Sequence, residues 1–263
     1  MRCGLLVRVV ALLTLAFLSL PLLIVVAASF TASGYLSFPP EGLSLEWYGR
    51  FLADSSYISS MLLSAGLALA AAAASALIGV PAAIGLRKSD SRLSAVLQMI
   101  FLSPLALPGI VIGAALFHFA AEIGLGRTFW ALLVGHSVIC APYVVRTTLA
   151  ALDDDLARLE DAADDLGASR AETFLLVTLP LIKPGVMAGL LLAFIISWIN
   201  VEVSMFSTTS ALMPIPVKMF NYVQYNVDPL IAAVSALTIY VALFAVIVVD
   251  RTIGLEKVAV SRN

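Results

Sequence analysis

Six long hydrophobic segments, separated by more polar stretches, dominate the pattern of the chain. A helix needs about 20 apolar residues to cross the hydrocarbon core of a bilayer. The pattern therefore predicts an all-α, polytopic membrane protein whose single transmembrane domain occupies residues 1–263. The six expected spans are residues 9–28, 58–86, 93–121, 129–149, 185–206 and 229–249.

The first segment has two readings. Arg2 and Arg8 precede it and Val26–Ala28 resembles a signal-peptide cleavage site, but the apolar core of a signal peptide is only about 7–15 residues long. We therefore expect a retained span.

Prolines and small residues mark other spans. Pro104 and Pro108 predict kinks in the third span. Gly66, Gly79 and the neighbouring alanines predict a face on which the second span packs against other helices.

Composition supports a membrane protein. Hydrophobic residues make up 61% of the chain and charged residues 12%, against roughly 25% charged residues in soluble domains. The net charge of −2 and the lack of a basic stripe argue against nucleic acid as a partner. Cys3 and Cys140 lack metal-ligand spacing, so no metal site is expected.

The loop between the fourth and fifth spans, residues 150–184, is the polar exception. It holds eight of the seventeen acidic residues, and its apolar positions recur every three to four residues, as in an amphipathic helix. Gly167 stands where that helix would end. Ser169 and Glu172 have the spacing of a capping box that starts a second helix, which Pro180 and Pro184 should stop or kink. The loop thus predicts two short helices at a defined angle.

Basic residues predict the orientation. With both termini inside, twelve Lys and Arg residues lie on the cytoplasmic side and three (Arg50, Arg127 and Lys218) lie outside. The positive-inside rule therefore favours an N-in/C-in topology with a cytoplasmic acidic loop.

The acidic loop resembles the EAA loop of ABC-importer permeases. The resemblance rests on Glu160, Asp161, Ala162 and Ala163, on Gly167, Ala168 and Ser169, and on Phe174, Thr178–Pro180 and Pro184–Gly185. One departure is Asp161, where the family has Glu. The resemblance implies that these residues couple the chain to a cytoplasmic ATPase subunit. A solvated acidic loop helix is the alternative interpretation.

Further stretches resemble the same family over residues 1–255, most of all its spermidine/putrescine group: Val80–Ala83, Leu107–Val111, Val217–Asp228 and Asp250–Leu255. The resemblance implies the type I importer fold, a bacterial inner-membrane location and alternating access. The implied partners are two ATPase subunits, a second permease or a copy of this chain, and an extracytoplasmic solute-binding protein. The sequence has no Walker A or other catalytic motif, so we expect no enzyme activity and no bound cofactor; ATP and Mg would belong to the partner ATPases.

Polar residues near the end of the fifth span are candidates for the translocation path. They are Ser197, Trp198, Asn200 and Glu202, because a carboxylate at membrane depth is costly and marks a functional site by default. Glu202 could instead lie at the outer interface. Polyamine permeases usually have two acids here, where this chain has Ile199 and Asn200, so a neutral or zwitterionic cargo stays open.

Other polar residues in the spans have more ordinary interpretations. His118 and Glu122 share a helix face and could gate or line the path, but we expect them to form a structural pair, and the same two interpretations apply to His136. Tyr143 and Arg146 are expected to anchor the fourth span at the interface.

Two alternative functions stay open. A permease of this class could carry 2-aminoethylphosphonate, ferric iron or an oxyanion instead of a polyamine. An ion-gradient-driven secondary transporter is the alternative from another class; such proteins tend to show inverted repeats, and we find none in the sequence.

Overall fold

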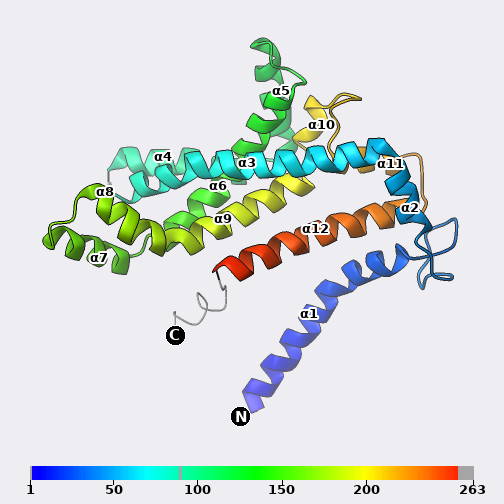
Figure 1. Cartoon of the computed structure of the whole chain (residues 1–263), viewed down its shortest axis with the longest axis horizontal. Helices are drawn as coiled ribbons and strands as arrows, with labels where there is room; N and C mark the ends of the chain where they lie inside the picture. The colour runs from blue at the N-terminus through cyan, green and yellow to red at the C-terminus, as the bar shows by residue number, and fades with distance from the viewer. Residues whose placement is uncertain (1, 89–90, 254–263) are drawn as a thin grey trace. The chain divides into compact units, whose positions relative to one another are not determined.

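The computed structural model describes residues 2–88 and 91–253, and every regular element within them is helical (Figure 1). The elements are, in chain order, α1 (Arg2–Ala28), α2 (Glu46–Ala53), α3 (Ser55–Arg87), α4 (Arg92–Leu102), the 3₁₀ turn η1 (Ser103–Ala106), α5 (Gly109–Glu122), α6 (Phe129–Ala151), α7 (Asp154–Asp165), α8 (Arg170–Thr173), the π-helical turn η2 (Phe174–Thr178), α9 (Leu179–Ile199), α10 (Ser204–Ser207), α11 (Ile215–Val223) and α12 (Leu230–Ile253). The predicted all-α class is confirmed. Part of the family-like tail, Gly254–Leu255, and two basic residues of the orientation count, Lys257 and Arg262, lie outside the described residues.

Five helices of the described part are long and apolar enough to cross a membrane, and a bent pair makes six if it counts as one span. The five are Leu6–Ala28, Ser55–Arg87, Phe129–Ala151, Arg170–Trp198 and Leu230–Thr252. They fall on five of the six segments expected from the hydrophobic pattern.

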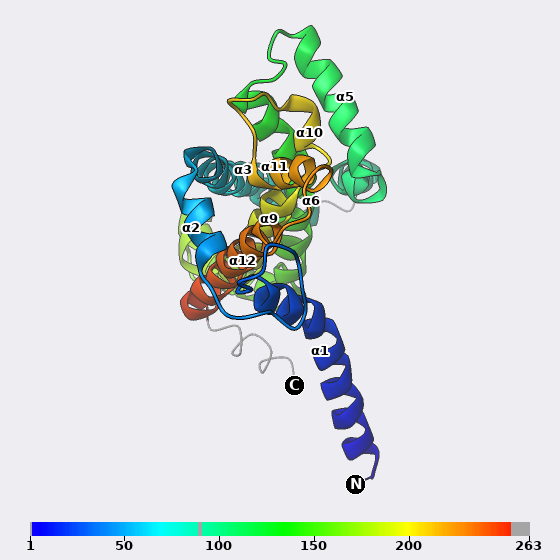
Figure 2. The same ribbon diagram turned by 90° about the vertical axis from the view of Figure 1, so that its right-hand side faces the viewer.

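The third expected span is the bent pair. α4 and α5 meet at 110°, and both views show the change of direction (Figures 1 and 2). Pro104 is the second residue of η1, and Pro108 is the N-cap of α5. A proline disfavours the helical conformation at the residue before it, and Leu107 is extended with ψ 142°. The chain therefore has a full break where the sequence analysis expected kinks.

The described chain forms two compact units. The first contains residues up to 59 together with residues 219–243. Within it, Ser29 and Tyr48 share a hydrogen bond of 2.6 Å, and the Tyr222 hydroxyl donates to Asp228 at 2.6 Å. Burial raises the pKa of Tyr222, and the bond to the Asp228 carboxylate acts in the same direction. Trp47 is buried, with the Arg50 guanidinium 4.3 Å from its ring centre.

Of the described residues, the second unit contains 60–218 and 244–253, and its core lies between α6 and α9. Small residues let these helices approach closely: a Cβ on Gly189 would lie 2.9 Å from Val144 Cα. Gly79 of α3 faces Val144 in the same way, as expected from the sequence. The expectation was wrong for Gly66, which is exposed and has no atom within 4 Å of its Cβ position among the described residues.

The acidic loop differs from the two short helices expected there. α7 is a short helix, but α8 continues through η2 into α9 without interruption. Pro180, the second residue of α9, does not stop it because it directly follows a π-helical turn in which the regular α-helical bonds are already interrupted. The Leu179 N–H reaches back to Phe174 O in the π-helical turn just before it. The helix that starts at the capping box is therefore the beginning of the fifth apolar helix itself.

Candidate functional site

Local sequence signals define both ends of α7. The Asp153 carboxylate accepts from Leu156 N at 3.0 Å, and Asp154 and Asp155 follow in the first turn, where the helix dipole favours negative charge. Gly167 ends the helix with φ 86°, the left-handed conformation that glycine adopts cheaply. The two closing bonds run from Gly167 N to Asp164 O at 2.9 Å and from Ala168 N to Ala163 O at 3.0 Å. This is a Schellman motif.

The next helix begins with the capping box expected from the sequence. Ser169 N donates to the Glu172 carboxylate at 2.8 Å, and Glu172 N donates to the Ser169 hydroxyl at 3.3 Å. The Thr173 hydroxyl also donates to Asp164 at 3.2 Å, which ties the two helices together. The turn around Gly167 is therefore fixed on both sides.

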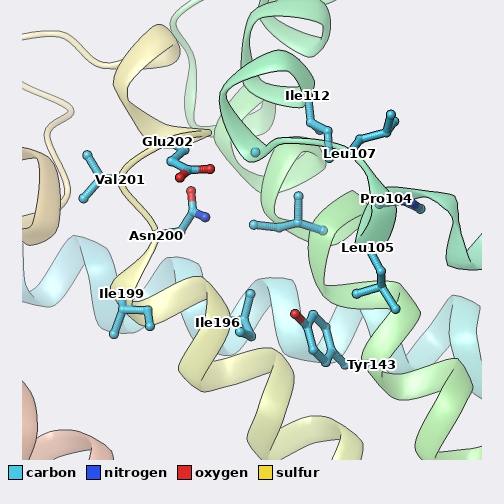
Figure 3. Close-up of a pocket in the computed structure, with 12 residues that line it drawn as sticks. Pro104, Leu105, Leu107, Ile112, Tyr143, Ile196, Ile199, Asn200, Val201 and Glu202 are labelled. Carbon is cyan, nitrogen blue, oxygen red and sulfur yellow. The ribbon is translucent and has the colours of Figure 1, made fainter.

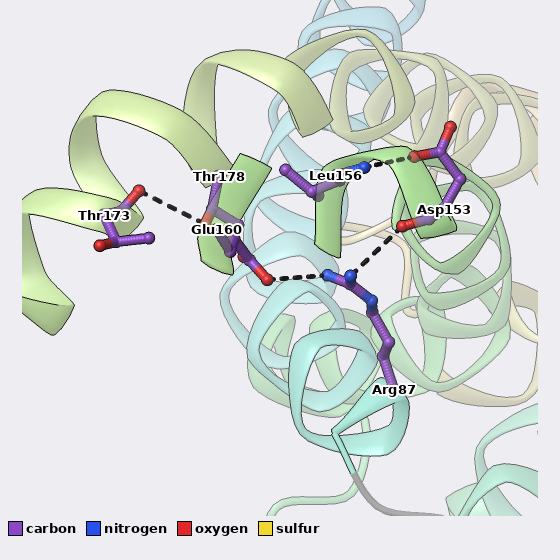
Figure 4. Close-up of polar contacts among 6 residues, drawn as sticks. All are labelled: Arg87, Asp153, Leu156, Glu160, Thr173 and Thr178. Atoms are coloured by element: carbon purple, nitrogen blue, oxygen red, sulfur yellow. Dashed lines mark hydrogen bonds and ion pairs between the residues drawn. The ribbon is translucent and has the colours of Figure 1, made fainter. Parts of the chain in front are cut away.

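The Glu160 carboxylate holds α7 against the rest of the second unit (Figure 4). Arg87 at the end of α3 pairs with it at 3.2 Å, and the Thr178 hydroxyl donates to its other oxygen at 2.5 Å. Arg87 also donates to Asp153 O at 3.2 Å. The Arg87 and Glu160 side chains are only 18% and 19% exposed, so the pair is better shielded than a surface ion pair. We call Arg87, Glu160 and Thr178 the latch.

The opposite face of α7 is uncovered in the chain. Leu156 packs into a buried cluster with Leu152 and Ile182, whereas Leu159 is 49% exposed and Leu166 90% exposed. Asp161 and Ala162 are exposed between them. The two acids at the start of the EAA-like motif thus differ: Glu160 faces the chain's own core, and Asp161 faces outward.

A pocket of about 460 Å³ lies where two helix breaks meet (Figure 3). One break is the bend between α4 and α5, and the other follows the end of α9 at Ile199. The lining is mostly aliphatic, with Tyr143, Asn200 and Glu202 as its polar side chains. The complete lining is Pro104, Leu105, Leu107, Gly109, Ile112, Ile139, Tyr143, Ile196, Ile199, Asn200, Val201 and Glu202.

Hydrogen bonds from side chains stabilise the non-helical backbone that follows α9. Asn200 is extended with ψ 119°, and its side-chain oxygen accepts from Val203 N at 2.9 Å. The Ser204 hydroxyl donates to Asn200 O at 2.9 Å. The fifth span was expected to run to residue 206 as one helix. It ends earlier because these polar groups satisfy the backbone at Asn200 in place of helical bonds.

Glu202 approaches the start of α5 closely. Its carboxylate occupies the place that a Cβ would take on Gly109, and its carbonyl oxygen lies 2.8 Å from the corresponding position on Gly113. These contacts place the carboxylate at the amino end of α5, where a helix favours negative charge. Only glycines leave room for it there.

The structure separates the four path residues predicted from the sequence. Asn200 and Glu202 line the pocket, but Ser197 and Trp198 are buried behind it, with Trp198 stacked on Phe194 at 6.0 Å. Tyr143, which was expected to anchor a helix at the interface, also lines the pocket.

The histidines also fall in different environments. His136 is buried and bonded to Ser197 and Ser204, whereas His118 and Glu122 are exposed on α5. Arg146 is exposed on α6.

Sequence reasoning missed the partners of Glu160 and the role of the bend. Arg87 counted only as a charge at a membrane boundary, and Thr178 only as part of a motif. Neither has a periodic signal that points to Glu160, because 73 residues separate Arg87 from it. The Pro108–Gly109 pair was the sequence signal available for the bend between α4 and α5, which forms one side of the pocket.

An all-helical membrane domain with a pocket at two helix breaks is an arrangement that transport proteins use. The family model described as the binding-protein-dependent transport system inner membrane component matches residues 75–251, and the chain belongs to that family. It is accordingly a multi-pass protein of the bacterial inner membrane.

Relatives agree with this assignment. The chain is 33% identical over 234 residues to the spermidine/putrescine transport system permease protein PotC of Haemophilus influenzae, covering 88% of this chain and 90% of the relative. It is 32% identical over 236 residues to the putrescine transport system permease protein PotI of Escherichia coli K12, covering 87% and 84%.

A crystal structure supports the fold. A bacterial ABC transporter involved in the import of the acidic polysaccharide alginate aligns with a TM-score of 0.63 at 16% identity, covering 95% of this chain and 96% of the other. At that identity the likeness speaks for the fold alone.

Proposed function

We propose that this chain is a permease subunit of an ATP-driven polyamine importer and that its cargo passes the pocket beside Glu202. The observation that carries the proposal is a single carboxylate in a largely aliphatic pocket. A polyamine joins ammonium groups through methylene chains, so it offers a charge for Glu202 and apolar surface for the isoleucines. The polyamine permeases among the relatives support the same cargo.

The charge of the pocket separates only some of the alternatives. A carboxylate attracts a polyamine or ferric iron and repels an oxyanion, and the carboxyl end of α9 and the amino end of α5 next to it carry partial charges of opposite sign. Ser197 and Trp198 support the path from behind by packing the end of α9, and Asn200 shapes the break that presents Glu202.

The coupling surface in this proposal is the exposed face of α7 together with the turn that follows it. Asp161, Ala162, Gly167, Ala168 and Ser169 would meet the partner ATPase, while Glu160 and Ala163 hold the surface in place from within. ATP and Mg would be bound by two such ATPase subunits. A second permease, identical or paralogous, and an extracytoplasmic binding protein would complete the importer.

The topology in this proposal is one permease domain over residues 1–263 with six spans and both termini in the cytoplasm. The bent pair α4–α5 would then count as the third span. The excess of basic residues on the inner side supports this orientation.

The test is ATP-dependent uptake of radiolabelled putrescine and spermidine by the complex reconstituted in liposomes. Glu202→Gln should lower uptake at least about tenfold, because it removes the only charge among the pocket residues. Glu122→Gln, an exposed acid of α5 outside the lining, is the matched control and should leave uptake unchanged. Equal uptake by both variants would contradict the proposed path.

A further inference from the structure

The residues of the break after α9 support its conformation only in part. Residues 200–203 have left the helix, yet they carry Asn200 and Glu202 to the pocket. Within the break, Asn200 accepts two hydrogen bonds, one on its side chain from Val203 N and one on its carbonyl oxygen from the Ser204 hydroxyl. The second bond depends on the rotation of a serine hydroxyl, which something else must fix.

His136 of α6 supplies that restraint. Its ring is 1% exposed, with Nδ1 2.7 Å from Ser197 Oγ and Nε2 2.8 Å from Ser204 Oγ. Ser197 lies in the last turn of α9 and Ser204 opens α10, so one imidazole spans the break from its last helical turn to the next helix. α6 itself is continuous at this level and offers a fixed point.

The hydrogen-bond directions determine the tautomer. A serine hydroxyl has one proton, and that of Ser204 is donated to Asn200 O, so it can only accept from His136. Nε2 therefore carries the ring proton and donates to Ser204. Nδ1 then accepts from the Ser197 hydroxyl. All the polar atoms of this buried group are satisfied by one arrangement, which favours a single conformation.

Next to His136, the break also packs closely between α5 and α6. A Cβ on Gly135 of α6 would lie 2.8 Å from Val203 Cγ1, and a Cβ on Gly113 of α5 would lie 2.9 Å from Val203 Cα. Val203 is buried between them. The residue next to Glu202 is thus fixed, and the direction of the carboxylate follows from the conformation at Asn200.

We propose that His136 is a positioning residue for cargo recognition, acting through Ser204 and Asn200 O on the direction in which Glu202 faces the pocket. The role in recognition rests on the proposed function, whereas the restraint on residues 200–204 does not. The hydrogen bond from His136 to Ser204 carries the effect, because only Ser204 continues to the backbone of the break through its bond to Asn200 O. The hydrogen bond to Ser197 anchors the ring to α9.

Two substitutions of His136 distinguish the roles of its two hydrogen bonds. His136→Gln places an amide near the position of Nε2 and can keep the bond to Ser204, whereas His136→Asn places one near Nδ1 and can keep only the bond to Ser197. Each loses one buried hydrogen bond, so a merely structural role predicts the same loss of thermal stability and of function in both. His118→Gln on exposed α5 is the control for the substitution itself.

The experiment measures hydrogen–deuterium exchange of residues 197–207 in the purified complex and the apparent KM for putrescine in ATP-dependent uptake. We expect His136→Asn to speed exchange in the break and to raise the apparent KM about tenfold, and His136→Gln to keep both within about twofold of the wild type. Exchange unchanged in His136→Asn, or equal changes in the two variants, would overturn the proposal. A wild-type complex that takes up no putrescine, while the exchange difference persists, would instead contradict the polyamine function and leave the restraint standing.

Discussion

Arg87 and Glu160 form an ion pair of 3.2 Å between the end of α3 and the middle of α7. Glu160 is held from its other side by Thr178, just before α9. The helix that carries the proposed coupling face is therefore attached to two apolar helices and not only to the one that follows it in sequence. A movement of α7 driven from the cytoplasm would reach α3 and α9 together.

Breaking the latch should uncouple ATP hydrolysis from uptake. Removing one partner of a pair that is about four-fifths buried leaves the other charge poorly compensated, so Arg87→Gln should cost about 1–3 kcal/mol, between the values for exposed and fully buried pairs. The measurements are thermal unfolding of the purified complex and the ratio of ATP hydrolysed to cargo imported.

The matched control is Arg158→Gln, which breaks the exposed pair with Asp155 on the same helix. It should change neither quantity measurably. An Arg87→Gln complex with wild-type stability and coupling would show that the latch has no such role.

Whether a substitution at Gly167 is tolerated should depend on the backbone conformation that the new residue can adopt, and not on the size of its side chain. No described atom lies within 4 Å of a Cβ built on Gly167, but its φ of 86° strains a β-branched residue by about 1–2 kcal/mol. Gly167→Val should reduce ATPase binding and uptake, whereas Gly167→Asn, which accepts the left-handed conformation more readily, should keep most of both. Titration of the reconstituted permease with the ATPase subunit gives the affinity, and equal affinities for the two variants would refute the argument.

The exposed leucine at the end of α7 should matter for partner binding and not for folding. Leu166 is 90% exposed, so Leu166→Ser removes no internal packing, but it removes apolar area from the proposed interface. We expect unchanged thermal stability and at least about tenfold weaker ATPase binding. Leu43→Ser, which changes a residue that is 82% exposed in the loop before α2, serves as the control. Full ATPase affinity in the Leu166 variant would place the interface elsewhere.

Gly109 should be indispensable for the pocket because Glu202 occupies its side-chain space. Gly109→Ala would push the carboxylate away from the start of α5, and a displacement of this kind should lower uptake by about tenfold or more. The control is Gly66→Ala in α3, where the added methyl group meets open space. Comparable uptake by the two alanine variants would mean that the position of Glu202 does not matter.

Much of the fold could be predicted because the bilayer imposes a simple pattern on the sequence. Largely apolar segments of about 20 residues predicted the apolar helices, and the Ser169–Glu172 spacing predicted the capping box that the structure contains. These signals are local. A cap or an apolar helix is encoded within one or a few turns.

What the sequence did not predict depends on contacts between distant segments. The break at Asn200 arises from Ser204 and Val203, and its support comes from His136, more than 60 residues earlier. Trp198 and Glu202 were both predicted to line the path because they are close in sequence. The helix ends between them at Ile199, so Trp198 is buried in the core and Glu202 lines the pocket. Helix termination by tertiary hydrogen bonds has no periodic signature that could have revealed this.

The most direct test of the account is uptake of radiolabelled spermidine by proteoliposomes that contain this chain with its co-purifying subunits. We predict that an ATPase subunit co-purifies, that uptake requires ATP on the side of the α7 surface, and that Arg87→Gln abolishes uptake while ATP hydrolysis continues. Uptake by the chain alone, driven by an ion gradient without ATP or an ATPase subunit, would contradict the account and assign the chain to the secondary transporters.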